Sequence, residues 1–425
     1  MKVKIVGPQT LQGKVRAPRS KAYTHRAFVA SMLAQGKSVI RDPLISDDTV
    51  NTLDAIQELG ARVHEGKIEL EVHGAGVPRA PERNLDCAES GATLRFLTAI
   101  ATTGSDKITL TSRTGLANRP IEPLLQALTK LGASADLHQE KDALRVTIQG
   151  PLKGGVTSIS GEISSQFISG LLMAAPFARS DVTINVEGNL ESKPYIDLTL
   201  AVLEKHGITA EREEKGFRIS APQEYKPASH HVPSDFSSTA PVVTGAATAG
   251  ETIVLTGIDG DYRSEPDSII LDLLPKIGIK IVINDNQLTV QKSRPRGFDF
   301  DARDHPDLVP VLEVLASQAE GKTTISGVKR LRFKESDRLN SVPSELIKMG
   351  ARINVAESAI TIEGVDHLKG STLSSHHDHR VAMACAIAAL AARGGSVLEE
   401  AQVVSKSYPA FFTDLETLGA KFNVE

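Results

Sequence analysis

One pattern of apolar and polar positions recurs six times along the chain. Each copy reads as an amphipathic helix, a glycine and then a strand in which apolar and polar residues alternate, as in "AIQELGARV". The glycines are Gly60, Gly132, Gly207, Gly278, Gly350 and Gly419, and neighbouring ones lie 69 to 75 residues apart. A glycine in this place is typical of the left-handed residue that ends a helix. The repetition predicts six copies of one structural unit.

A second pattern runs in register with the first. Ala-rich stretches such as "ASMLAQGKSVI" and "AALAARGGSVL" predict a helix, a turn and a β-branched strand, again in six copies. These helices lack a polar face, so we expect them to be buried and the amphipathic helices to lie outside. The fold class is therefore α/β, with two helices and several strands in each unit. An open solenoid is one way to stack six units, but two lobes of three units fit strand-rich units better.

Composition limits the functions open to this chain of 425 residues. The net charge of −4 argues against a nucleic-acid binder, and aromatic residues make up only 4% with no Trp, so base stacking is not expected. The longest apolar run, Val381 to Ala392, is too short to span a bilayer. Two cysteines, Cys87 and Cys385, do not form a disulfide framework. We therefore expect a cytoplasmic protein with no membrane partner.

Cationic side chains gather where helices are expected to begin. They are Lys21, Arg26, Arg95, Arg119, Lys334, Arg338, Arg380 and Lys406. A cation at a helix N-terminus opposes the helix dipole, so its placement is unfavourable unless an anion is present. Ser and Asp at the same places are ordinary N-caps, which by itself explains residues such as Asp235 and Asp304. The cations predict a pocket for small molecules that carry several negative charges.

The stretch "SSHHDHR", residues 374–380, raises the question of a metal site. His and Asp are common zinc ligands. However, Arg380 follows directly, and no cluster of Cys or Glu elsewhere in the sequence offers further ligands. We interpret the stretch as a helix start capped by Asp378, with His379 and Arg380 directed at an anion, and we expect no metal.

Several of these stretches resemble motifs of the 5-enolpyruvylshikimate-3-phosphate synthase family over nearly the full length of the chain. The motifs are "PRSKAYTHRA", "ESGATLRFL", "NRPI", "SSQFISGLLMAAP", "SKPYIDLT", "HPDLVP", "FKESDRL", "DHRVAM" and "SKSYP". The resemblance implies a two-lobed, inside-out α/β barrel-like fold with three repeated units in each lobe. One lobe would comprise residues 15–231, and the other residues 1–14 with 232–425.

The resemblance also implies the reaction. The enolpyruvyl group of phosphoenolpyruvate is transferred to the 5-hydroxyl of shikimate 3-phosphate by addition and then elimination of phosphate, with no metal or organic cofactor. Glyphosate is the family's competitive inhibitor. We expect these two small molecules as the only partners, and a monomeric protein.

Site residues are carried over from the family motif by motif. Those matching the phosphoenolpyruvate pocket are Lys21, Gly91, Arg119, Gln166, Arg338, Arg380 and Lys406. Those matching the shikimate 3-phosphate pocket are Lys21, Ala22, Arg26, Ser164, Ser165, Gln166, Ser192, Tyr195, Asp307, Arg330 and Lys334. The family implies Asp307 as the general base, with Glu335 or Lys21 as the group that moves the second proton. The sequence does not decide between Glu335 and Lys21.

Some positions depart from the family pattern. Ala22 replaces a common Ser, Ala92 a common Thr, Phe96 a common Pro and Arg330 a common Asn. Two alternative interpretations are a UDP-N-acetylglucosamine enolpyruvyl transferase and a catalytically inactive protein that only binds an anionic metabolite. The first usually has a reactive Cys before the arginine that matches Arg119, and "TSRTGLANR" has none. The second would lack Asp307, Glu335 or Lys21, all of which are present.

Overall fold

The computed structural model describes all 425 residues and divides the chain into two compact units. Unit 1 contains Met1–Arg19 and Pro233–Glu425, and unit 2 contains Ser20–Val232. The expected boundary at residue 15 was too early. Strand β2 (Leu11–Arg16) pairs in parallel with β15 (Gly250–Thr256), and Arg19 forms a bridge to Ser234, so residues 15–19 belong to unit 1.

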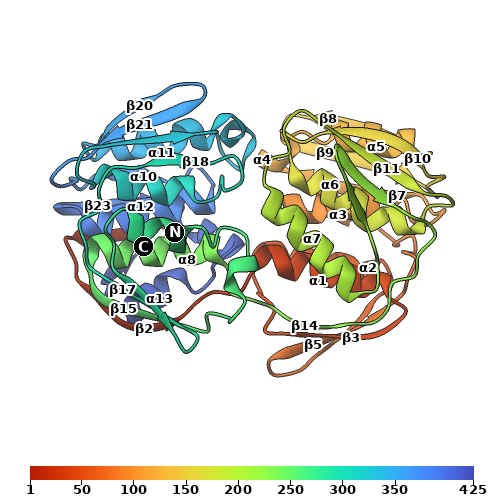
Figure 1. Cartoon of the computed structure of the whole chain (residues 1–425), viewed down its shortest axis with the longest axis horizontal. Coiled ribbons are helices and arrows are strands. Elements are labelled where there is room, and N and C mark those ends of the chain that lie inside the picture. Colours follow the sequence, from red (N-terminus) through yellow and green to blue (C-terminus); the bar gives the residue numbers. More distant parts are fainter. The chain divides into compact units, whose positions relative to one another are not determined.

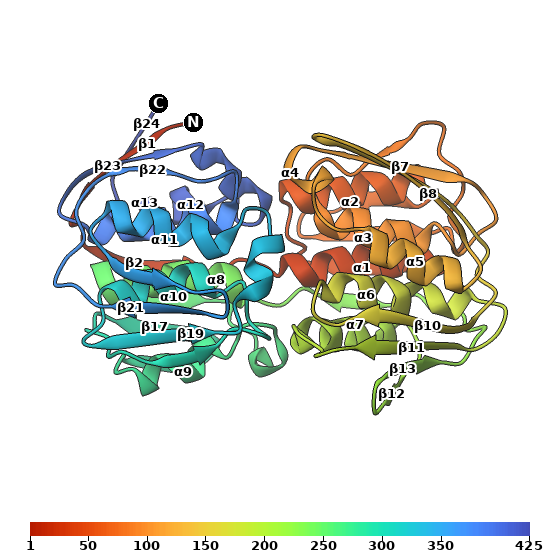
Figure 2. The ribbon, with the colours of Figure 1, turned by 90° about the horizontal axis from the view of Figure 1, so that it is seen from above.

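Unit 2 has three inner helices and three outer helices (Figure 2). The inner ones are α1 (Lys21–Leu33), α3 (Gly91–Ile100) and α6 (Ser165–Ala174), and the outer ones are α2 (Asp47–Glu58), α5 (Glu122–Lys130) and α7 (Lys193–Lys205). Short helical turns are α4 (Thr114–Ala117) and η1 (Ala175–Phe177). Nearly every residue of the inner helices is buried, as their missing polar face predicts.

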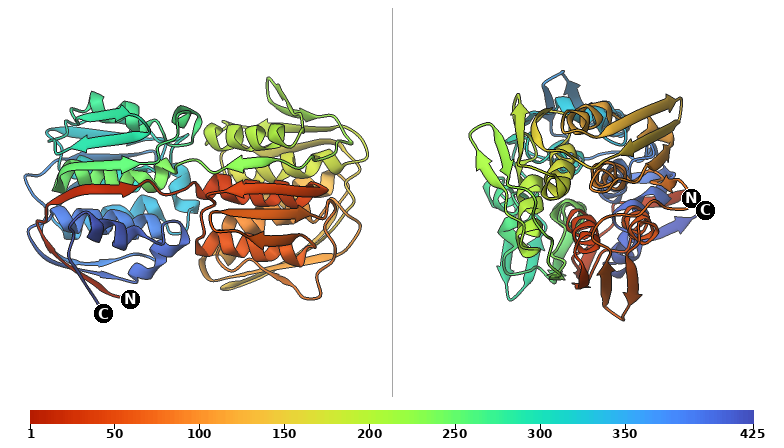
Figure 3. Two further views of the ribbon diagram at one scale, coloured as in Figure 1. Left: turned by 90° about the horizontal axis from the view of Figure 1, so that it is seen from below. Right: turned by 90° about the vertical axis from the view of Figure 1, so that its right-hand side faces the viewer.

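Three four-stranded sheets surround the inner helices of unit 2, and the right-hand view of Figure 3 shows these strands outside the helices. The first sheet has the order β14 (Ser229–His231), β3 (Gly36–Arg41), β5 (Glu69–Gly74), β4 (Arg62–Glu65). The second has the order β6 (Leu85–Asp86), β7 (Ile108–Arg113), β9 (Ala143–Gln149), β8 (Ser134–Glu140). The third has the order β10 (Gly155–Ser160), β11 (Val182–Glu187), β13 (Gly216–Ile219), β12 (Glu211–Glu213).

Unit 1 repeats the same plan (Figure 1). Its inner helices are α8 (Phe236–Ala249), α10 (Val309–Ser317) and α12 (His379–Ala391), and its outer helices are α9 (Ile270–Lys276), α11 (Arg338–Lys348) and α13 (Phe411–Thr417). Short turns are η2 (Tyr262–Ser264), η3 (Lys329–Phe333) and η4 (Ala401–Lys406). The inner helices pack on one another and are buried.

The sheets of unit 1 draw on both ends of the chain. One sheet has the order β16 (Ile281–Asn284), β17 (Gln287–Gln291), β15, β2, and a second has the order β18 (Asp299–Asp301), β19 (Lys322–Ser326), β21 (Ala359–Glu363), β20 (Arg352–Val355). The third has the order β22 (Thr372–Ser374), β23 (Gly394–Glu399), β1 (Val3–Gly7), β24 (Phe422–Val424). Each of the six sheets has one parallel pair and two antiparallel pairs.

The six helix-ending glycines behave as the repeat predicts. All have positive φ, between 77° at Gly207 and 109° at Gly60. A residue with a Cβ is disfavoured in this conformation, which explains why every copy of the unit uses glycine here.

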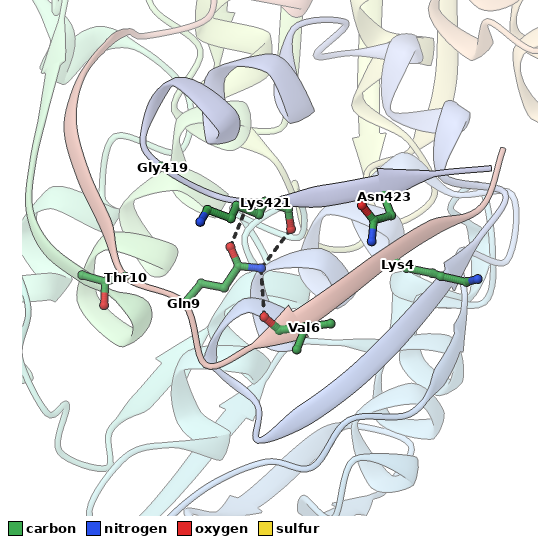
Figure 4. A pocket seen from close by; sticks show the side chains of 7 residues that line it. All are labelled: Lys4, Val6, Gln9, Thr10, Gly419, Lys421 and Asn423. Carbon is green, nitrogen blue, oxygen red and sulfur yellow. Dashed lines mark hydrogen bonds between the residues drawn. The ribbon is translucent and has the colours of Figure 1, made fainter.

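Each unit closes on itself, which excludes the open solenoid. In unit 2, β14 comes last in the chain but pairs with β3 of the first repeat. In unit 1, β1 pairs with both β23 and β24. The side chain of Gln9 reinforces this closure, because its Nε2 donates to the carbonyl oxygens of Val6 and Lys421 and its Oε1 accepts from the amide of Lys421 (Figure 4).

Candidate active site

The N-terminal ends of the inner helices are capped by side chains in five of six cases. Ser20, Ser90, Ser164, Asp235 and Asp378 each accept a hydrogen bond from a backbone amide in the first turn of the helix that follows. Helix α10 has no side-chain cap, so the interpretation of Asp304 as a cap is wrong. These ends hold about half of the predicted site residues, and others, such as Ser192 and Arg338, lie at the starts of outer helices.

Lys21 begins helix α1 in unit 2 and is paired with a carboxylate. Its Nζ lies 2.8 Å from Oδ2 of Asp48, and the two side chains are 17% and 8% exposed. Asp48 belongs to the first turn of α2 and was not among the predicted residues. It offsets part of the unfavourable interaction between Lys21 and the dipole of α1.

Arg26 is only 2% exposed, and most of its hydrogen bonds are made within unit 2. Its Nε donates to Thr199 Oγ1 at 2.7 Å, and its Nη2 donates to the carbonyl of Tyr195 at 3.0 Å. Its Nη1 also donates to the carbonyl of Ala22, and its guanidinium lies 5.1 Å from the ring centroid of Phe96. Arg26 therefore fixes α7 against α1 within unit 2.

A second cationic group surrounds the start of α3. Arg95 Nη1 donates to Oε1 of Gln166 at 2.6 Å. A Cβ at Gly91 would lie 3.2 Å from Arg119 Nη1 and 3.5 Å from Arg95 Nη1. Glycine therefore lets two guanidinium groups approach the positive end of a helix, an arrangement that suits an anion.

The remaining predicted residues of unit 2 lie at the starts of α1, α6 and α7. Ser164 caps α6 and Ser165 is its first residue, and both are largely buried. Ser192 precedes α7 in the left-handed region, with φ 55°. Tyr195 and Ala22 are half-buried. Strained backbone of the kind seen at Ser192 is common at ligand sites.

In unit 1, Asp307 lies among three cations. Its Oδ1 is 3.0 Å from Lys334 Nζ and 2.8 Å from Arg338 Nη1, and its Oδ2 is 3.9 Å from Arg380 Nη2. Burial alone would raise the pKa of Asp307, but the three positive charges outweigh it and hold the pKa well below the usual value. Burial lowers the pKa of Lys334 to about 8, although Asp307 acts in the opposite direction.

Asp378 holds several site groups together. Its two carboxylate oxygens accept from Arg338 Nε at 2.7 Å and Arg338 Nη2 at 3.0 Å, while Oδ1 also caps α12 through the amide of Arg380. Ser336 donates to it from both its amide and its hydroxyl. Burial lowers the pKa of Arg338, but Asp378 and Asp307 reverse this and raise it above the usual value. Arg338 is therefore a fixed cation.

Glu335, His379 and Lys406 form a third contact group. His379 Nδ1 lies 2.8 Å from Glu335 Oε2, and Lys406 Nζ lies 3.9 Å from the same oxygen. Oxygen and nitrogen atoms of Glu335, Asp378 and His379 fall within 4.8 Å of one another. The sequence shows no cluster of Cys or Glu that would supply further ligands, but the fold brings the single residue Glu335 beside two residues of "HHDHR". Because Arg338 occupies both oxygens of Asp378, this group suits a cation poorly.

Arg380 and Arg330 also belong to the group of charged residues around Asp307, Asp378 and Glu335 in unit 1. Arg380 donates from Nη1 and Nη2 to the carbonyl and hydroxyl of Ser237, and its Nε has no partner in the protein. Arg330 lies in η3 and is 6% exposed. Five cations here, including Lys334, Arg338 and Lys406, thus face three carboxylates, so the cluster keeps a net positive charge.

The structure contains other hollows that the site residues do not line. The one in Figure 4 has a volume of about 390 Å³ and is lined by Lys4, Val6, Gln9, Thr10, Gly419, Lys421 and Asn423. No helix is long and apolar enough to cross a membrane.

The comparison with solved structures tests the predicted fold. The structure matches the enolpyruvyl transferase NikO of Streptomyces tendae with a TM-score of 0.80, covering 99% of this chain and 98% of that one. At 20% identity this likeness shows the fold alone. The predicted inside-out α/β fold of six units, here with six four-stranded sheets, is confirmed.

The sequence comparisons narrow the class to one family. The family model for EPSP synthase (3-phosphoshikimate 1-carboxyvinyltransferase) matches residues 5–415. A 3-phosphoshikimate 1-carboxyvinyltransferase of Methanocella arvoryzae is 41% identical, and the match covers 97% of each chain. EPSP synthase from Acinetobacter baumannii matches with a TM-score of 0.83 at 26% identity over 100% of both chains. The chain belongs to the EPSP synthase family. Its activity is carboxyvinyl transfer to 3-phosphoshikimate, in the shikimate pathway of aromatic amino-acid biosynthesis.

Proposed function

We propose that the chain transfers the enolpyruvyl group of phosphoenolpyruvate to the 5-hydroxyl of shikimate 3-phosphate, using the residues described above. The observation that carries this assignment is Asp307 within reach of Lys334, Arg338 and Arg380. A carboxylate that can accept a proton thus lies beside cations that can hold phosphate and carboxylate groups.

The binding assignments follow the family motifs. Phosphoenolpyruvate would contact Lys21, Gly91, Arg119, Gln166, Arg338, Arg380 and Lys406. Shikimate 3-phosphate would contact Lys21, Ala22, Arg26, Ser164, Ser165, Gln166, Ser192, Tyr195, Asp307, Arg330 and Lys334. The geometry supports Arg380 in particular, since its buried Nε–H has no acceptor in the protein and an anion would supply one. Arg26 contributes less directly, because most of its donors are already used.

The addition step requires two proton movements. The 5-hydroxyl loses its proton to Asp307 as its oxygen bonds to C2 of phosphoenolpyruvate, while the methylene carbon C3 gains a proton. Asp307 is a weak base while three cations surround it. Anionic substrates beside the same cations would offset their field and raise the pKa of Asp307 toward the range of a useful base.

The second proton carrier is Glu335 or Lys21. Glu335 is held by His379, and Lys21 is held by Asp48. In the elimination step the methyl group at C3 returns its proton and the C2–O bond to phosphate breaks, which yields the enolpyruvyl product and inorganic phosphate. We favour Glu335, because its contact with His379 gives the carboxylate a fixed orientation.

Further features of the proposal are a monomer in the cytoplasm, with no nucleic-acid or membrane partner and no cofactor. Cys87 and Cys385 are both free and buried, and burial raises the pKa of each thiol above its usual value. Buried thiols of this kind agree with a reducing compartment.

The decisive experiment measures inorganic phosphate released from phosphoenolpyruvate with and without shikimate 3-phosphate. We expect release only when both substrates are present, and a lower kcat for Asp307→Asn by roughly 10²–10⁴-fold. Asp304→Asn is the matched control, since it changes a neighbouring Asp of the same loop that the proposal does not use. Phosphate release without shikimate 3-phosphate, or full activity in Asp307→Asn, would overturn the proposal.

A further inference from the structure

Unit 2 contains a continuous line of buried hydrogen bonds that the proposed mechanism does not use. His25 Nδ1 lies 2.7 Å from Thr52 Oγ1, Thr52 Oγ1 lies 2.6 Å from Thr93 Oγ1, and Thr93 Oγ1 lies 2.7 Å from Ser90 Oγ. The four residues come from α1, α2, α3 and the cap of α3, and none is more than 1% exposed.

The two threonines in this line behave differently from other helical threonines of unit 2. Thr24, Thr98 and Thr199 donate their hydroxyls to the carbonyl four residues earlier, which is the usual arrangement in a helix. Thr52 and Thr93 instead point at each other between α2 and α3. Their hydroxyls are therefore not needed to satisfy their own helices.

The direction of the line follows from counting protons. Thr93 donates to Ser90 Oγ, so its own oxygen accepts from Thr52. The hydrogen of the Thr52 hydroxyl is then donated to Thr93, so the Thr52 oxygen accepts a hydrogen bond from Nδ1–H of His25. Every hydrogen bond thus runs from His25 toward Ser90.

Ser90 is the last residue of this series of hydrogen bonds, and the hydrogen of its hydroxyl group remains available for donation. Its Oγ accepts from the hydroxyl of Thr93 and, at 3.4 Å, from the amide of Thr93, while its own O–H meets no acceptor in the protein. Ser90 caps α3 directly before Gly91, where Arg119 Nη1 and Arg95 Nη1 converge. Two guanidinium groups, a helix N-terminus and a hydroxyl with a spare proton therefore meet in one place.

We propose that the Ser90 hydroxyl donates a hydrogen bond to an anionic group of phosphoenolpyruvate, and that His25, Thr52 and Thr93 are positioning residues that aim it. This inference rests on the proposed function, in which Gly91 and Arg119 bind that substrate. A chain of hydrogen bonds that all point the same way also polarises its last member, which makes Ser90 a stronger donor.

The expected effects differ between Ser90, which would contact the substrate, and Thr52, which would act through Ser90. Ser90→Ala removes a hydrogen bond to a charged group and is expected to raise KM for phosphoenolpyruvate about tenfold. Thr52→Val keeps the shape of the side chain but removes the link to His25. It is expected to raise the same KM by about threefold, because Ser90 remains but is less firmly aimed.

The test measures KM for both substrates, kcat and thermal stability in Ser90→Ala, Thr52→Val, Thr52→Ser and Thr98→Val. Thr98→Val is the matched control, since it removes an equally buried hydroxyl of α3 that bonds only to its own helix. We expect KM for phosphoenolpyruvate to rise in Ser90→Ala and Thr52→Val, to return toward wild type in Thr52→Ser, and to stay unchanged in Thr98→Val. KM for shikimate 3-phosphate is expected to stay constant in all four.

Two results would overturn the inference. One is an unchanged KM for phosphoenolpyruvate in Ser90→Ala. The other is a Thr52→Val variant that matches Thr98→Val in every kinetic constant, because the line would then be purely structural. Wild-type turnover, measured first in the same assay, separates these results from failure of the proposed function itself.

Discussion

Acid should destabilise unit 2 through a pair of buried histidines. His206 Nε2 lies 2.9 Å from His230 Nε2, His230 Nδ1 lies 3.1 Å from Tyr23 Oη, and Lys205 Nζ donates to the same oxygen at 2.9 Å. At the other end, His206 Nδ1 lies 2.7 Å from the carbonyl oxygen of Lys226. The network joins α1, α7 and β14, and both imidazoles are fully buried.

The proton positions in this network allow only neutral histidines. A carbonyl only accepts, so His206 Nδ1 carries a hydrogen and its Nε2 is an acceptor. His230 must then donate from Nε2 and accept from the hydroxyl of Tyr23 at Nδ1. A proton added to His206 would place two N–H groups face to face. Burial, the main cause, lowers the pKa of His206 to about 4 and that of His230 to about 3.

The sign and size of the effect follow from linkage. Both folded pKa values lie below about 6.5, the value in an unfolded chain, so the unfolded state binds more protons in acid. The stabilisation is complete above pH 6.5 and is lost as pH falls toward 4 and then 3. At pH 5 each histidine costs about 2 kcal/mol relative to neutral pH, and the slope is about 1.4 kcal/mol per pH unit per histidine. His25, whose pKa burial also lowers well below its usual value, acts in the same direction.

The assay is urea unfolding at several pH values between 5 and 7.5. We expect the free energy of unfolding of the wild type to fall steeply below pH 6.5. In His230→Gln we expect the fall per pH unit to be smaller by the contribution of one proton, which is about 1.4 kcal/mol. His138→Gln is the matched control, because the His138 side chain is 56% exposed, and it should leave the slope unchanged. A slope in His230→Gln equal to that of the wild type would refute the assignment of the buried pair.

Four further variants have defined expected outcomes. Glu335→Gln should lower kcat by roughly 10²–10⁴-fold with small effects on either KM, and wild-type turnover would remove Glu335 from the mechanism. Ala22→Ser should lower KM for shikimate 3-phosphate by around tenfold and leave KM for phosphoenolpyruvate unchanged, whereas weaker binding would show that residue 22 does not face that substrate. His377→Gly should raise the free energy of unfolding by about 0.5–1 kcal/mol, because it relieves a φ of 56°. His376→Gly, at a φ of 50°, should instead lower it, because the imidazole bonds the buried Glu345 at 2.7 Å, and equal effects in the two denaturation curves would contradict this reasoning.

The repeated architecture could be predicted from the sequence because its signals are local. Helix α12, for example, is apolar on every side after its first two residues, and each outer helix is followed by a glycine that adopts positive φ. The pairing of β2 with β15 is not local, since it joins segments more than 230 residues apart. No pattern within residues 11–16 specifies that partner, which is why the sequence predicts a boundary at residue 15 whereas unit 1 extends to Arg19.

For the candidate site, the sequence predicts the charged residues but not their partners within the protein. Residue types and helix starts pointed to Lys21, Arg338 and Arg380, but not to the groups that hold them. Asp48 lies in the first turn of α2, where an acidic residue is already favoured by the helix dipole, so its role beside Lys21 has no separate signal in the sequence. Likewise, Asp378 was correctly predicted as a cap, but its bidentate contact with Arg338 depends on the packing of α11 against α12.

These carboxylates neutralise part of the positive charge that the cations place at the helix starts. Without ligand, Asp48 offsets Lys21, Asp378 offsets Arg338, and Asp307 contacts Lys334 and Arg338. Because Asp378 already offsets Arg338, the single charge of Asp307 is shared between Lys334 and Arg380. An arriving phosphate or carboxylate can therefore pair with those cations without displacing a full ion pair. The same event makes Asp307 more basic. In the proposed function, binding of the anionic substrates and activation of Asp307 as the base are thus two consequences of one charge arrangement.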